Sequence, residues 1–146
     1  MSFFGSMNTT ASGLTAQRLR MDVISQNIAN ADTTRTPEGG PYRRKEVLFE
    51  AMNNSPSFNN VLQDYMKGKN KGVRVANIVE DNTQSPLVYN PAHPDANEQG
   101  YVSMPNVNII DEMVNMISAS RSYEANVTAF NSMKEMMTKA LEIGKR

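Results

Sequence analysis

The two ends of the chain carry apolar side chains at helical spacing, and the middle does not. Near each end, apolar residues recur every three or four positions, with a polar residue at an occasional position of the series. A stripe of this period on a helix buries itself against another helix. We therefore predict helix or subunit contacts for Met7, Leu14, Met21, Ile24, Ile28, Ile109, Met113, Met116, Tyr123, Val127, Phe130, Met137 and Leu141.

Each stripe lies in a stretch that predicts one long helix. The first spans residues 6–31, roughly 38 Å at 1.5 Å per residue, with Ser6 as its N-cap. The second begins after Asn106 or Asn108 and ends at Gly144, a length of about 53 Å. These two helices are the strongest secondary-structure signals in the chain.

The intervening segment, residues 36–100, is rich in Pro, Gly and Asn, which interrupt helices. Residues 50–72 are predicted to form a mobile loop, because they are rich in Asn, Ser, Gly and Lys. Alternating apolar residues predict short extended segments at residues 42–49, 73–79, 87–89 and 101–104.

The predicted fold is mainly α with a small β-containing insert. We expect a coiled-coil domain of the two terminal helices, residues 1–33 with 106–146, and a central extended or β segment, residues 34–105. Pairing the helices antiparallel places both termini at one tip and the insert at the other. Gly13 either permits close helix approach or is tolerated at a cost of about 1 kcal/mol.

The second helix outruns the first by roughly ten residues, so part of its stripe has no partner within the chain. Burying one large apolar side chain contributes about 1.5–3 kcal/mol. Several left exposed favour an oligomer over a monomer. We expect the ends of the isolated chain to be largely unstructured until they meet a neighbour.

Charge is balanced overall but uneven along the chain. Residues 34–75 hold eight basic and four acidic side chains, a net of +4, and residues 76–112 hold six acidic and no basic ones, a net of −6. Two such blocks fold onto each other, pair between subunits, or remain two solvated surfaces. The sequence leaves these alternatives open.

Nothing in the sequence predicts catalysis, a metal site or a cofactor. There are no cysteines, and His93, the single histidine, lacks neighbours at ligand or catalytic spacing. The adjacent acids Asp111 and Glu112 suit a helix N-terminus or solvent exposure better than acid–base chemistry. The neutral net charge argues against nucleic-acid binding, although residues 43–45 are all basic.

Membrane insertion and secretion signals are also not predicted. No stretch approaches the roughly 20 apolar residues of a membrane span. The first residues lack the basic region and apolar run of a cleavable secretory signal. If the protein leaves the cytosol, we expect export with an uncleaved N-terminus.

One sequence motif is specific. Residues 27–34, Asn-Ile-Ala-Asn-Ala-Asp-Thr-Thr, followed by a glycine-containing turn and Tyr-Arg-Arg at 42–44, resemble the N-terminal signature of bacterial flagellar rod and hook proteins. Residues 89–96, 100–108 and 112–127 are similar to one type of member, a proximal-rod protein. The motif positions are Asn27, Ala29, Asn30, Gly39, Gly40, Pro41, Tyr42 and Arg43.

The resemblance implies a structural, non-catalytic subunit of the basal-body rod. Such proteins polymerise helically with copies of themselves and with other rod proteins, above the membrane ring and the export gate. They pass through the flagellar type III export apparatus without signal cleavage and assemble in the periplasmic space. Their terminal helices form an inner coiled-coil layer that lines the export channel, and they need no cofactor.

Two other readings are compatible with parts of the pattern. Another type III axial subunit would share the terminal helices, and the proline–glycine turn and the His-Pro-Asp loop argue against it. A soluble coiled-coil interaction module would form a stable dimer with both helices present in solution. Loss of such a module would leave the rod intact.

Overall fold

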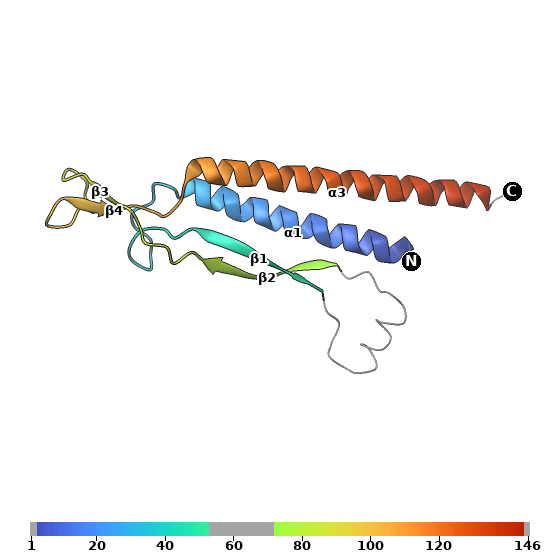
Figure 1. The fold of residues 1–146 in the computed structure, drawn as a ribbon, viewed down its shortest axis with the longest axis horizontal. Coiled ribbons are helices and arrows are strands. Elements are labelled where there is room, and N and C mark those ends of the chain that lie inside the picture. Colours follow the sequence, from blue (N-terminus) through green and yellow to red (C-terminus); the bar gives the residue numbers. More distant parts are fainter. Residues whose placement is uncertain (1–2, 53–71, 145–146) are drawn as a thin grey trace, which may run out of the picture. The chain divides into compact units, whose positions relative to one another are not determined.

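The computed structural model describes residues 3–52 and 72–144, and its elements follow the expected order. Two long helices enclose four short strands in the sequence (Figure 1). The described elements are α1 (Phe3–Ala29), β1 (Lys45–Ala51), β2 (Val73–Glu80), β3 (Leu87–Tyr89), β4 (Tyr101–Ser103) and α3 (Ile109–Ile143). This confirms the mainly α fold with a small β insert. The mobile loop predicted near residues 50–72 falls mostly outside the described residues.

The helix boundaries differ slightly from those predicted. Helix α1 already begins at Phe3, so Ser6 lies inside the helix instead of capping it. Its hydroxyl-bearing residues fit the helix because their side chains bond to carbonyls one turn earlier, as Thr10 Oγ1 does to the Ser6 carbonyl at 3.1 Å. At the start of α3, Asn108 Oδ1 accepts a 3.0 Å bond from the Ile110 N–H, which confirms Asn108 as the N-cap.

The chain divides into two compact units, and each contains part of both helices. The first unit comprises Met1–Leu19, Phe49–Ala76 and Ala119–Arg146, and the second comprises Arg20–Leu48 and Asn77–Ser118. The predicted division into a domain of residues 1–33 with 106–146 and a central segment of residues 34–105 has other boundaries than these two units, and it stays a prediction. No described helix is both long enough and apolar enough to cross a membrane.

In the first unit, α1 approaches α3 closely at a glycine. A Cβ atom built on Gly13 would lie 3.3 Å from both the Nδ2 and Oδ1 atoms of Asn126, so Gly13 leaves room for this amide. The small residues Ala16 and Ala119 are nearly fully buried in the same unit. Gly13 therefore does permit close approach, one of the two readings left open by the sequence.

In the second unit, β3 and β4 form an antiparallel hairpin with Val88 opposite Val102. Val102 is 2% exposed, and Val23, Ile24 and Ala31 are also buried in this unit. Strands β1 and β2 form a separate two-stranded sheet. All four strands fall within about three residues of the predicted extended segments, because alternation is a local signal.

Candidate functional site

A buried polar cluster in the second unit joins the end of α1, the start of β1 and the start of α3. Its centre is Asn27, which is 0% exposed. The Nδ2 group of Asn27 donates to Glu112 Oε2 at 2.9 Å and to the Lys45 carbonyl at 2.8 Å. Its Oδ1 atom accepts from the Lys45 N–H at 2.9 Å and from the Tyr42 hydroxyl at 3.0 Å. All the hydrogen-bonding capacity of the amide is used.

Glu112 supplies the negative charge of this cluster and is 1% exposed. Its second oxygen, Oε1, accepts a 2.8 Å bond from Arg44 Nε, so the buried carboxylate is both paired and hydrogen-bonded. Burial alone would lower the pKa of Arg44, but the bond to Glu112 and the charges of Glu112, Glu46 and Asp81 together raise it. Glu112 lies in the first turn of α3, as one of the two readings of the sequence predicted, but it is not solvent-exposed: its side chain is turned toward Arg44 and Asn27.

Asn106 connects the segment before α3 to the buried polar cluster through hydrogen bonds. Its Oδ1 atom accepts from the Arg44 N–H at 2.8 Å, and its Nδ2 group donates to the Asp81 carbonyl at 3.0 Å. The Asp81 N–H in turn donates to the Arg44 carbonyl at 2.8 Å.

Thr83 lowers the pKa of Asp81 through its hydroxyl and its N–H. Burial, with the charges of nearby acids, raises the pKa of the Tyr42 hydroxyl.

The glycine-containing turn lies immediately before this cluster in the sequence. The Thr36 N–H donates to the Gly40 carbonyl at 2.9 Å, and the Gly39 N–H donates to the Thr36 carbonyl at 3.0 Å. Gly39 and Gly40 have φ angles of 91° and 81°, a region that favours glycine. The Tyr42 N–H then bonds to the Thr33 carbonyl at 3.0 Å, which returns the chain to the end of α1.

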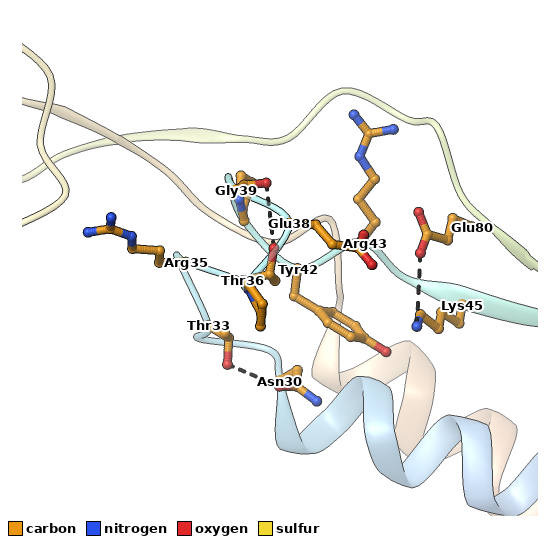
Figure 2. Close-up of a pocket in the computed structure, with 12 residues that line it drawn as sticks. Asn30, Thr33, Arg35, Thr36, Glu38, Gly39, Tyr42, Arg43, Lys45 and Glu80 are labelled. Carbon is orange, nitrogen blue, oxygen red and sulfur yellow. Dashed lines mark hydrogen bonds and ion pairs between the residues drawn. The ribbon is translucent and has the colours of Figure 1, made fainter.

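A cavity of about 510 Å³ opens beside this turn (Figure 2). Its charged residues are of both signs, and Lys45 Nζ lies 3.9 Å from Glu80 Oε1. The described residues include no group of three or more His, Cys, Asp or Glu side chains that could hold a metal ion. The lining residues are Asn30, Thr33, Arg35, Thr36, Pro37, Glu38, Gly39, Pro41, Tyr42, Arg43, Lys45 and Glu80.

The basic and acidic blocks of the sequence meet within one chain. Arg35 NH1 lies 4.0 Å from Asp95 Oδ1, and Arg44 pairs with Glu112 and approaches Asp81 to 3.8 Å. Each of these pairs joins a residue of the block 34–75 to one of the block 76–112. At these positions the opposite charges pair within one chain.

The predicted contact residues differ in burial and fall into three groups in the structure. Ile24 is buried, and the half-buried ones are Met7, Leu14, Met21, Ile28, Met116, Tyr123, Val127, Phe130 and Met137. The exposed ones are Ile109, Met113 and Leu141. Their role between subunits stays a prediction.

A second apolar stripe on α3 was not predicted, although one of its members, Met113, belongs to the predicted contact residues. It consists of Ile110, Met113, Val114 and Ile117, which are 72%, 54%, 61% and 53% exposed, and we call it the outer stripe. Its i, i+3, i+4, i+7 spacing was present in the sequence and could have found it. The predicted four-then-three series on this helix includes Met113 but none of the other three residues, which lie one position further along the chain.

Comparison with known proteins identifies relatives over the full length. Residues 7–35 match the family described as "Flagella basal body rod protein", and residues 98–143 match "Flagellar basal body rod FlgEFG protein C-terminal". The chain is 52% identical to flagellar basal-body rod protein FlgC of Borreliella burgdorferi over 98% of each chain. It is 51% identical to FlgC of Bacillus subtilis, over 99% of this chain and 100% of the relative, and 37% identical to FlgC of Aquifex aeolicus, over 99% of each.

Proposed function

The chain belongs to the family of flagellar basal-body rod proteins, and from that premise we propose how it builds the rod. It is a structural subunit of the proximal rod and not an enzyme. The observation that carries this assignment is the 52% identity to a FlgC protein across 98% of both chains. Because the match spans both terminal helices and the insert, it concerns the whole subunit.

We propose that α1 and α3 pair antiparallel as a coiled coil. In the first unit Gly13 lies against Asn126, and in the second Asn27 bonds to Glu112. Residue numbers thus rise on one helix as they fall on the other, which supports this pairing. The buried polar cluster would fix the register, as a single buried amide does in many coiled coils.

We propose further that the outer stripe is buried between subunits when the rod polymerises. Large apolar side chains more than half exposed on one helix face mark an interaction surface. Each contributes about 1.5–3 kcal/mol when a neighbour covers it. Copies of this chain and other rod proteins are the partners, and many such weak contacts add up along a helical lattice.

The route to the rod is proposed from the sequence resemblance. The subunit passes through the flagellar type III export apparatus with its N-terminus uncleaved. It then assembles in the periplasmic space above the membrane ring and the export gate. Ordering on contact with neighbours carries a conformational cost, which keeps single contacts weak and reversible until the lattice forms.

Electron microscopy of basal bodies from a strain lacking this chain tests the proposed function. We expect loss of everything distal to the membrane ring, no swimming, and recovery of both with the wild-type gene. Intact rods and normal swimming in the deletion strain would contradict the assignment and favour a soluble coiled-coil module.

A further inference from the structure

The two edges of the β3–β4 hairpin differ in how many of their backbone groups are bonded. Its register pairs Leu87 with Ser103, Val88 with Val102, and Tyr89 with Tyr101. The Asn90 N–H donates to the Gly100 carbonyl at 2.9 Å, and the Met104 N–H donates to the Pro86 carbonyl. In an antiparallel ladder, bonded pairs alternate with pairs whose N–H and C=O groups point outward. The backbone groups of Leu87 and Tyr89 therefore point away from β4.

The outer edge of β4 is partly occupied by its own loop, which bonds to Tyr101. The Tyr101 N–H donates to Asn97 Oδ1 at 2.8 Å, and the Tyr101 carbonyl accepts from the Asn97 N–H at 2.9 Å. On β3, by contrast, the two outward N–H groups and two outward C=O groups of Leu87 and Tyr89 have no partner in the described part of the chain. Among the described residues, the outer edge of β3 is therefore open at both of its outward-facing positions, whereas that of β4 is open only at Ser103.

An exposed apolar face adjoins this open edge. Leu87 and Tyr89 are 61% and 64% exposed, and the Tyr89 and Tyr101 rings meet edge to face at 5.3 Å. A Cβ atom on Gly100, whose φ is 82°, would come within 2.9 Å of the Tyr89 ring, so this glycine leaves room for the ring. Val102, on the opposite face, is buried.

We propose that the outer edge of β3 accepts an extended apolar strand from a neighbouring rod subunit. Unpaired, outward-facing main-chain groups are recognised by a strand, since a helix keeps its own N–H and C=O groups bonded internally. Alternate side chains of the incoming strand would cover Leu87 and Tyr89. The addition makes a three-stranded sheet, which is more stable than an isolated hairpin. This proposal rests on the proposed function, because it needs the subunit to sit in a rod.

Hydrogen exchange of the free chain and of purified basal bodies tests the proposal directly. We expect the Leu87 and Tyr89 amides to exchange freely in the isolated chain and about 100-fold more slowly in the rod. If the chain is present in basal bodies and these amides still exchange as in the free chain, the strand proposal fails alone. If the chain is not recovered in basal bodies, the proposed function fails.

A pair of substitutions separates the backbone from the side chain. Leu87→Pro removes one outward N–H at an edge position where proline is tolerated, and Leu87→Ala keeps that N–H but removes the apolar side chain. We expect Leu87→Pro to reduce the number of complete rods at least about tenfold more than Leu87→Ala. Equal effects of the two would overturn the proposal.

A photo-cross-linker identifies the neighbour. With Tyr89→p-benzoylphenylalanine, irradiation of purified basal bodies should yield a cross-link to a rod subunit. A cross-link to a membrane-ring protein, or none, would contradict the proposal. The hydrogen-exchange test on the wild-type chain does not depend on this variant folding.

Discussion

Asn27 is a small side chain that connects three segments far apart in the sequence. It reaches Lys45 across 18 positions and Glu112 across 85. Because the amide is fully buried and fully bonded, no other side chain of its size reproduces its pattern of two donors and an oxygen acceptor. The cluster therefore depends on the identity of this residue more than on its volume.

We predict that Asn27→Asp strongly destabilises the second unit. The substitution places a carboxylate oxygen where Nδ2 lies 2.9 Å from Glu112 Oε2, so two buried like charges would meet. A buried, uncompensated charge costs about 3–5 kcal/mol. Urea unfolding should report this loss, and the same substitution in a Glu112→Gln background should cost less. Equal losses in both backgrounds would contradict the assigned contact.

The free energy of unfolding should depend on pH through the ionisation of the Tyr42 hydroxyl. Burial and nearby acids raise its pKa in the folded state. The stabilisation is then complete below the unfolded pKa of about 10 and is lost as the pH rises through the folded value. Tyr42→Phe should cost about 0.5–1.5 kcal/mol at neutral pH through the lost bond to Asn27.

Urea unfolding at a series of pH values checks this prediction. The wild-type chain should lose more free energy of unfolding above pH of about 10 than Tyr42→Phe does. Tyr123→Phe, on α3, is the control for the loss of a tyrosine hydroxyl outside the buried polar cluster. Identical alkaline profiles for the wild type and Tyr42→Phe would show that Tyr42 ionises alike in both states.

At the scale of elements, local patterns predicted the helices and strands well. Apolar alternation located β2 at Val73–Glu80, and Asn108 marked the start of α3. What could not be predicted depends on long-range contacts. In the sequence, Glu112 is indistinguishable from an ordinary acid in the first helical turn. Its burial is tolerated because it pairs with Arg44, which lies 68 positions away in the chain.

The motif residues illustrate the same limit. The resemblance singled out Asn27, Gly39, Gly40 and Tyr42, yet it gave no physical reason for their presence. The structure supplies one, since the glycines make a positive-φ turn and Tyr42 donates its hydroxyl to Asn27. The two-donor role of the Asn27 amide had no signature in local spacing.

The close approach of α1 and α3 at Gly13 makes a prediction about helix packing. Alanine normally stabilises a helix interior by about 0.8–1.0 kcal/mol over glycine. At Gly13 the new Cβ would press against the Asn126 amide at 3.3 Å, so the gain should be smaller or reversed. In an Asn126→Ala background the full gain should return. Thermal unfolding of the four variants measures this coupling, and additive effects would exclude the contact.

At the scale of the whole molecule, the subunit carries exposed apolar surface on two elements. The outer stripe lies on α3, and further exposed apolar residues lie on the β3–β4 hairpin. Such surface suits an assembly of many weak contacts better than an isolated soluble protein. Some opposite charges, by contrast, pair inside the chain, as Arg44 does with Glu112.

We predict that Ile117→Asp blocks rod assembly and leaves export intact. Ile117 is 53% exposed in the subunit, so a charge there should not disturb the fold. Covered by a neighbouring subunit, however, the charge would be buried without a partner. Asn131→Asp, at another exposed position of α3, is the matched control and should assemble normally. The measurements are swimming on soft agar and the amount of the chain secreted. Normal swimming of Ile117→Asp would exclude the outer stripe from the interface.

The most direct test of the account is an electron cryomicroscopy reconstruction of the basal body that resolves side chains in the rod. We predict that this chain occupies the proximal rod, with α1 and α3 antiparallel and with Ile110, Val114 and Ile117 covered by a neighbouring subunit. A reconstruction in which the chain is present but these three side chains face solvent would contradict the proposed interface. A rod that lacks the chain altogether would contradict the function itself.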